Sequence, residues 1–415
     1  MPGLPGRRLL SYIRAVRRLQ VSAPPAWGRG LGMLSILVAM LLPSTAAAKA
    51  DDWPDVSGKQ RRAVLMCRFS DSPTPSLRDK AYFQGLFGPG KGLSGYYDEA
   101  SYGKIDFTPT VHDWKTIGPR ASFGIDGDTS TGGQDADAIF NACTAAHDTE
   151  VDFHSVDGID LILDESQDIG PSLGGSHLAT LDGVNDFWPW TMIGSRYDEV
   201  GDQPDDAALF AHEIGHSFGL PHTVGKGIKS HGFDPMGFTC GWGFFTGDFD
   251  PDYDCLPVHY LAAHKDLLGW IPKSRRFTLS PQKKRSRATR KVTIERVARP
   301  AGNKNPLIAR FPVPGKPATF YTAEARMEVG NFDSDVNLAD DGVVITKVVL
   351  DCQGTPQCQF DFTPTEVQGI DKDQNGFLDP ESTYTRGETF RKGKLKIKVV
   401  KKLPHAFKLE VTNRK

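Results

Sequence analysis

Short apolar runs bounded by charged and turn residues mark the first part of the chain. Residues 63–69 (AVLMCRF) and residues 159–163 (IDLIL) are two such runs, and each predicts a strand in the core of a sheet. Between them, residues 136–146 have the pattern of a helix. A second helix is expected to begin at Pro204 and the two carboxylates that follow it, and to end near His216. This alternation predicts a first domain of mixed α and β structure.

The pattern changes after residue 272. A basic segment at residues 273–291 is expected to be a solvated linker, with a polyanion-binding site as the alternative, and the sequence beyond it is rich in strand patterns. Four stretches have the apolar content or the alternation of strands, at residues 291–294, 342–350, 394–399 and 407–411. They predict a small domain resembling a β-sandwich. The chain is therefore predicted to be α+β, with a first domain at residues 49–272 and a β-rich domain at residues 273–415.

The N-terminal segment has the order of a secretory signal. Several arginines precede an apolar stretch at residues 31–42, and small residues follow it up to Ala48. This stretch is shorter than the roughly 20 residues that a membrane-spanning helix needs. We predict a signal peptide at residues 1–48, a secreted or extracellular protein with the periplasm as the alternative location, and no stable membrane span. An uncleaved anchor is the alternative, because the basic leader is long.

Charge and cysteine content narrow the picture further. The chain has 49 Lys and Arg against 51 Asp and Glu, so no charge imbalance points to nucleic acid as a partner, and nothing specifies an oligomeric state. All six cysteines follow the predicted cleavage site, which favours three disulfides. Short loops favour the pairs Cys352 with Cys358 and Cys240 with Cys255, leaving Cys67 for Cys143. The alternative is that some are free buried thiols.

The candidate chemistry is concentrated in one stretch, AHEIGHSFGLPH. His212 and His216 are four residues apart, so on a helix both side chains point the same way and can bind one metal ion. Gly219 allows a sharp turn after the helix, which brings His222 to the same ion. Three imidazoles leave the fourth position of a tetrahedral zinc ion to water, as in catalytic sites. Glu213 can then act as general base on that water.

The spacing H-E-x-x-H-x-x-G-x-x-H resembles the zinc motif of the metzincin metalloproteases, and the sequence DPMG around Met236 resembles their methionine turn. The resemblance implies a metzincin catalytic domain, in which a mixed sheet accompanies a zinc-binding active-site helix. It also implies that Met236 lies beneath the three histidines without binding the metal. Phe238 stands where some metzincins have a tyrosine ligand, so no fourth protein ligand is expected.

Further segments are similar to the immune inhibitor A and gametolysin branch of that family. They lie at residues 96–104, 264–270, 320–326, 342–350 and 387–390. The resemblance implies a secreted zinc-dependent endopeptidase that hydrolyses peptide bonds of extracellular proteins, with Zn²⁺ as cofactor and proteins or peptides as substrates. Taken from their residues alone, the first two segments are packing segments with aromatic anchors.

Two other functional classes compete with this interpretation. One is a secreted binding protein that keeps zinc without cleaving peptides, and its adhesive part would be the β-rich domain. Glu213 argues against it, because a purely structural zinc site needs no base beside its first ligand. The other is a zinc hydrolase acting on a non-peptide amide or ester, which digestion of a protein substrate would distinguish.

An Asp-rich loop predicts a metal site of a different kind. Oxygen-bearing side chains alternate there, with glycine at the sixth position, as calcium loops require. These candidate ligands are Asp371, Asp373, Asn375 and Asp379. Ser382 occupies the twelfth position, where an EF-hand has glutamate, so the alternatives are a differently closed Ca²⁺ site and a plain Asx-rich turn. The acidic loop at residues 248–254 is expected to be solvated, with calcium the alternative.

The remaining histidines have no ligand spacing of their own along the sequence. We expect surface or packing roles for His112, His147, His154, His177, His231, His259, His264 and His405. Among them, His231 lies between the third ligand and the methionine turn, from where it could approach a substrate cleft.

Overall fold

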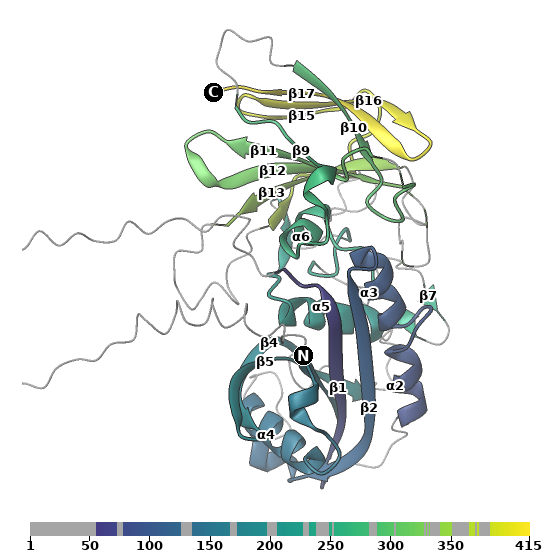
Figure 1. Cartoon of the computed structure of the whole chain (residues 1–415), viewed down its shortest axis with the longest axis vertical. Helices are drawn as coiled ribbons and strands as arrows, with labels where there is room; N and C mark the ends of the chain where they lie inside the picture. Colours follow the sequence, from purple (N-terminus) through teal and green to yellow (C-terminus); the bar gives the residue numbers. More distant parts are fainter. Residues whose placement is uncertain are drawn as a thin grey trace, which may run out of the picture. The chain divides into compact units, whose positions relative to one another are not determined.

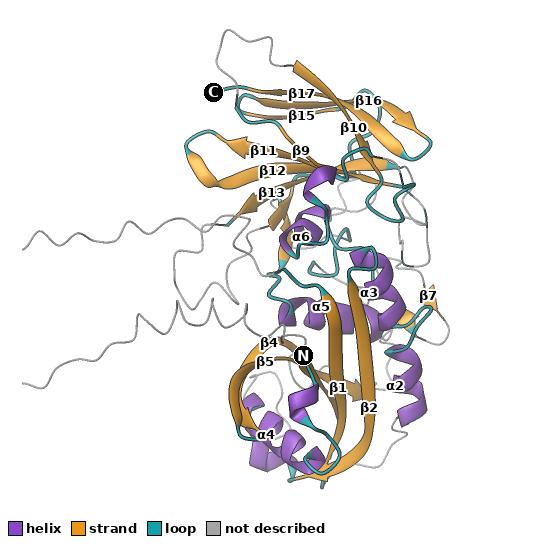
Figure 2. Ribbon diagram, in the orientation of Figure 1, coloured by secondary structure: helices purple, strands orange, loops and turns teal. Residues whose placement is uncertain are grey.

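Strands make up most of the regular structure and form several sheets with few helices, so the fold is mixed α+β (Figures 1 and 2). This computed structural model describes residues 55–72, 78–125, 135–166, 172–196, 206–226, 232–237, 249–250, 253–281, 289–302, 304–327, 329, 332, 341–350, 365–369, 372 and 382–415. Within these residues, no helix has the length and apolar character to cross a membrane. The predicted signal peptide lies outside them.

The first part of the chain forms a five-stranded sheet in the order β2-β1-β3-β5-β4. Its strands are β1 (Gly58–Phe69), β2 (Ile105–Ile117), β3 (Gly158–Ser166), β4 (Leu173–Leu181) and β5 (Val184–Arg196). Neighbouring strands are parallel, except that β4 is antiparallel to β5. The strands predicted at residues 63–69 and 159–163 are confirmed as parts of β1 and β3.

β1 has an uninterrupted apolar run because the sheet is covered on both faces. Val64 and Met66 contribute to one hydrophobic cluster, while Ala63, Leu65 and Cys67 contribute to another. Successive side chains of a strand point to opposite faces, so these two sets belong to the two sides of the sheet. A strand buried on both sides has no polar face and needs no alternation.

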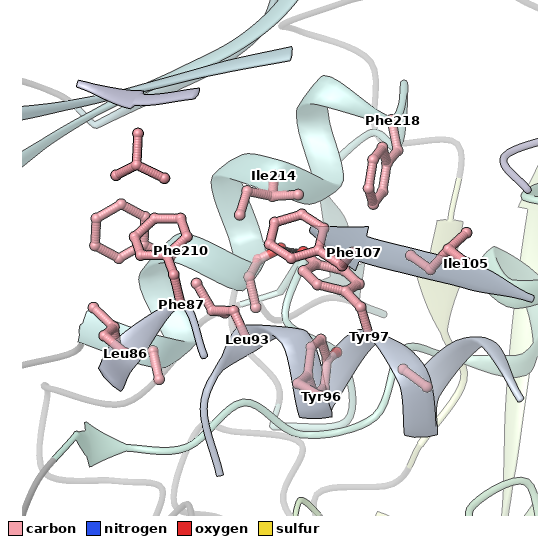
Figure 3. Packing of buried hydrophobic residues seen from close by; sticks show 14 of the residues in the cluster. Leu86, Phe87, Leu93, Tyr96, Tyr97, Ile105, Phe107, Phe210, Ile214 and Phe218 are labelled. Carbon is pink, nitrogen blue, oxygen red and sulfur yellow. Dashed lines mark hydrogen bonds between the residues drawn. The ribbon is translucent and has the colours of Figure 1, made fainter. Parts of the chain in front are cut away.

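Helices supply both covering layers. The first cluster draws residues from α2 (Lys80–Leu86), α3 (Leu93–Ser101) and α5 (Asp206–Ser217), and Figure 3 shows Tyr97 of α3 and Ile214 of α5 within it. The second cluster draws residues from α4 (Ala136–His147), which confirms the helix predicted at residues 136–146. A disulfide joins Cys67 of β1 to Cys143 of α4, as predicted.

The segment from Gly174 to Phe187 is a tight hairpin of β4 and β5. Asp182 and Gly183 form its turn with φ values of 48° and 77°. Two consecutive residues with positive φ are typical of a type I′ turn, for which Asp-Gly is a favoured sequence. The Asp-Gly dipeptide is therefore a sequence signal for this hairpin.

The later part of the chain forms two larger sheets. The six-stranded sheet has the order β6-β14-β13-β12-β11-β9, and the four-stranded sheet has the order β10-β17-β16-β15. Their strands are β6 (Thr223–Gly225), β9 (Arg276–Thr278), β10 (Thr289–Glu295), β11 (Ile308–Val313), β12 (Lys316–Arg326), β13 (Gly342–Val349), β14 (Thr365–Val367), β15 (Thr389–Lys392), β16 (Leu395–Leu403) and β17 (Ala406–Asn413). The four strands predicted in this region are confirmed in β10, β13, β16 and β17.

One hydrophobic cluster unites the two larger sheets. Ile294 and Leu409 of the four-stranded sheet share it with Phe311, Tyr321 and Ile345 of the six-stranded sheet. Two sheets that bury one face against each other form a two-layer arrangement. Part of the basic segment predicted to be a linker is strand β9, which pairs with β11 at the edge of the six-stranded sheet.

The six-stranded sheet also takes in a strand from before residue 273. β6 follows His222 directly and pairs in parallel with β14, while the backbone N–H of Lys226 donates to Val367 O at 2.8 Å. The remaining short elements are η3 (Arg120–Phe123), η5 (Phe153–Ser155), β7 (Phe249–Asp250), β8 (Asp254–Cys255), α6 (Ala262–Leu267) and η7 (Lys273–Arg275). Residues of α6 and of β12 and β13 share one hydrophobic cluster.

Candidate metal centre

Helix α5 presents two of the candidate ligands on its half-buried side. Phe210 and Ile214 are buried in the first hydrophobic cluster, where Figure 3 shows Phe210 beside Phe87, whereas His212 and His216 are only partly buried. The Tyr260 hydroxyl donates to Ala211 O at 2.6 Å and fixes the middle of the helix. The apolar side of α5 therefore sets the direction in which the two imidazoles point.

The chain reverses immediately after α5. Gly219 has φ of 89°, its backbone N–H donates to His216 O, and the N–H of Leu220 donates to Gly215 O. A glycine with positive φ at this position is a common way to end a helix. The chain then enters β6, so His222 lies between the end of α5 and a strand held by the six-stranded sheet.

The Nε2 atoms of the three histidines converge. His212 and His216 are 3.1 Å apart at Nε2, His216 and His222 are 3.1 Å apart, and His222 and His212 are 3.2 Å apart. Two nitrogens that each lie about 2.0–2.1 Å from one tetrahedral zinc ion are about 3.3 Å from each other. The triangle of nitrogens therefore fits three ligands of one ion.

Backbone carbonyls fix the tautomers of the two helical ligands. His212 Nδ1 lies 2.6 Å from Pro235 O, and His216 Nδ1 lies 2.7 Å from Leu220 O. Since a carbonyl only accepts, each Nδ1 carries the proton and each Nε2 presents a lone pair to the centre. Metal-ligating histidines have this arrangement in general. The donor chemistry thus fits a divalent ion that favours imidazole nitrogen.

Burial keeps all three imidazoles neutral at ordinary pH. It lowers the pKa of His212 to about 4 and that of His216 to about 3, and it also lowers the pKa of His222. A neutral imidazole is the form that binds a metal ion.

Glu213 is the buried acidic group of the centre. Its side chain is 5% exposed, and burial raises the pKa of the carboxyl to about 8. A carboxyl with pKa near neutrality is suited to exchange protons with a substrate, and a cation held by the neighbouring histidines would lower this pKa. Strand β4 lies against this point of α5, because a Cβ added at Gly174 would come within 2.0 Å of Glu213 O.

The turn at Asp234 to Gly237 contacts His212 and the residue that follows His222. Pro235 O accepts from His212, and the backbone N–H of Thr223, next to the third histidine, donates to Met236 O at 2.8 Å. Met236 is fully buried, and a Cβ added at Gly215 would lie 2.4 Å from its Sδ. The structure thus brings Met236 against the helix between His212 and His216.

Two buried pairs that the sequence analysis did not foresee support this turn. Asp234 Oδ2 lies 2.7 Å from His264 Nδ1 of α6, and both side chains are fully buried. Arg326 of β12 donates to Phe233 O at 2.7 Å and pairs with Glu324 at 2.7 Å. The contacts of Asp234 with His264 and of Arg326 with Phe233 join residues far apart in the sequence. A charged residue inside an otherwise apolar strand, as in FYTAEAR, was the available signal for the second pair.

Several predicted residues lie outside the described residues. These are Cys240, Cys352 and Cys358, the calcium-loop positions Asp371, Asp373, Asn375 and Asp379, and also His231 and Phe238. Cys255 is described and is buried at the end of β8. The structure brings together His212, Glu213, His216, His222 and Met236.

Comparison of the sequence with protein-family models and with curated proteins finds no match. The geometry of this centre is therefore the observation that bears on function.

Proposed function

We propose that the chain is a secreted zinc-dependent endopeptidase of the metzincin type. The observation that carries the proposal is the convergence of three neutral imidazoles at Nε2, with separations of 3.1–3.2 Å, beside the buried carboxyl of Glu213. The three ligands come from helix α5 and from the turn beyond it. One side of an ion bound by them would therefore stay open to water and substrate. The assignment to the metzincin type is supported by the contact of the Met236 turn with the helix.

Bound zinc would supply a Lewis acid that polarises the scissile carbonyl and acidifies water. Glu213 accepts a proton from the attacking water and delivers it to the departing amine, so the carboxylate is restored at the end of the cycle. His212 and His216 hold their tautomers through Pro235 O and Leu220 O while this happens. Burial around Glu213 limits the loss of that proton to bulk water.

Strand β4 supports a peptide as the substrate. It is the last strand of its sheet, and within the described residues it pairs with β5 alone. The edge of a sheet can bind an extended peptide through main-chain hydrogen bonds. β4 approaches α5 at Glu213, so a peptide added to this edge would pass beside the proposed general base.

Cleavage of casein by the purified chain tests the proposal. We expect peptide products whose new termini show internal cleavage, loss of cleavage after a chelator, and recovery when zinc is restored. A His222→Ala variant should lose the zinc ion of this centre together with cleavage. Zinc binding without cleavage of any protein tried would instead favour a binding protein, and cleavage that survives both the chelator and His222→Ala would overturn the proposal.

A further inference from the structure

A second group of side chains that can bind a metal ion lies where β2 meets the end of α4. It comprises His112 of β2, His147 at the last position of α4, and Glu150 just beyond the helix. One potential ligand atom of each lies within 4.8 Å of the others. Glu150 Oε2 is 3.7 Å from His147 Nδ1 and 3.9 Å from His112 Nδ1. The two histidines have no ligand spacing along the sequence, so only the fold brings them together.

His147 is oriented as a ligand. Its side chain is 0% exposed, and its Nε2 lies 3.2 Å from Met66 O. Because a carbonyl accepts, Nε2 carries the proton and Nδ1 presents a lone pair toward His112 and Glu150. Within the described part of the chain this buried Nδ1 has no hydrogen-bond partner. Metal-ligating histidines donate their second ring nitrogen to such a carbonyl and direct the first at the ion.

Glu150 offers one oxygen to the two histidines and keeps the other engaged. Lys115 of β2 pairs with Oε1, which leaves Oε2 facing the imidazoles. The side chain of Glu150 is 38% exposed and that of His112 is 15% exposed, so an ion could enter from solvent. By contrast, the group Asp152, His154 and Asp182 is exposed throughout.

We propose that His112, His147 and Glu150 form a second metal site, for a divalent transition ion such as zinc, with water completing the coordination. Two imidazole nitrogens and one carboxylate oxygen suit zinc rather than calcium or magnesium, which prefer oxygen ligands. The ion cross-links the edge strand β2 to the end of α4. The disulfide between Cys67 and Cys143 joins the same helix to β1. The disulfide and the ion would therefore connect α4 to two neighbouring strands, β1 and β2.

Zinc content tests the site separately from the proposed protease centre. In a full-chain His212→Ala/His216→Ala variant, which lacks two ligands of that centre, we expect one zinc ion per chain to remain after desalting. Adding His112→Ala should remove it, whereas His154→Ala from the exposed group should not. Absence of zinc in the first variant would overturn the second site without affecting the protease proposal.

Thermal unfolding of the same variants gives an independent readout. We expect added zinc to raise the Tm of the His212→Ala/His216→Ala chain, and we expect this rise to disappear when Glu150→Gln is also present. Glu150 is a partly exposed side chain beyond the helix, so its replacement should leave the circular dichroism spectrum unchanged. An equal rise in Tm with and without Glu150→Gln would contradict the assignment.

Discussion

At the scale of single residues, the close contact between Gly215 and the methionine turn has a definite consequence. A methyl group at Gly215 would lie 2.4 Å from Met236 Sδ and 3.0 Å from the Tyr260 hydroxyl, both of which belong to buried side chains. We expect Gly215→Ala to lower the free energy of unfolding by about 1–3 kcal/mol and to weaken zinc binding. Urea unfolding and zinc titration measure the two effects.

The control is the double variant Gly215→Ala/Met236→Ala. Shortening Met236 makes room for the added methyl group, so the double variant should bind zinc better than Gly215→Ala alone. Strictly additive effects of the two substitutions on zinc affinity would show that this contact does not matter to the centre.

His259 predicts how stability changes with pH. It is fully buried, its Nε2–H donates to Glu99 at 3.0 Å, and Nδ1 lies 2.8 Å from Lys265 Nζ. Burial lowers its pKa to about 3. Below its ordinary pKa of about 6.5 the unfolded chain binds the proton and the folded chain does not, so stability falls as pH falls.

The expected slope from His259 is about 1.4 kcal/mol per pH unit between pH 6 and pH 4. Urea unfolding of His259→Gln over this range should show a slope shallower by about that amount than the parent chain. The other buried histidines contribute to both chains and cancel in the comparison. Equal slopes would mean that His259 takes up its proton in the folded state.

At the scale of elements, strand β12 supports the segment that carries the methionine turn. Arg326 donates to Phe233 O and to His259 O, and its pairing with Glu324 balances a buried charge. We expect Arg326→Met to cost about 3–5 kcal/mol of stability, because Glu324 would be left buried without its cation. Thermal or urea unfolding checks this value. The double variant Glu324→Gln/Arg326→Met should recover part of the loss, and no recovery would contradict the role of charge.

The sequence predicts elements best where one local pattern decides the outcome. Residues 63–69 and 159–163 are strands because their apolar runs are buried between two layers of helices, and α5 follows from its first turn and from Gly219. The short strand β6 has no such pattern, since three residues acquire strand geometry only through β14, far along the chain.

The residues of the candidate centre also differ in whether a local sequence pattern predicts them. His212 and His216 are recognisable because helical spacing alone brings them to one side, and His222 because Gly219 allows the chain to turn back toward them. The pair of Asp234 and His264, and the group of His112, His147 and Glu150, depend on contacts between distant segments. Their side chains could equally have packed at a surface, and only the tertiary structure decides between these outcomes.

At the scale of the whole molecule, direct contacts connect the six-stranded sheet to the candidate centre. β6, β14 and Arg326 connect the sheet to His222 and to the methionine turn, and α6 shares a hydrophobic cluster with β12 and β13. We expect a chain ending at residue 272 to lose the zinc ion of the candidate centre and to aggregate, because it lacks these supports and exposes the apolar side of α6. Size-exclusion chromatography and zinc content test this, and a soluble, active fragment would refute it.

The most direct test of the account is to measure zinc content and casein cleavage together for the parent chain and for Glu213→Gln. Glu213 is buried beside the ligands but is not one of them, so the variant should keep the zinc bound by the three histidines. Turnover should fall by about 10²- to 10⁴-fold, because the group that carries the proton is lost. Retained zinc with unchanged turnover would contradict the role of Glu213 and the peptidase mechanism built on it.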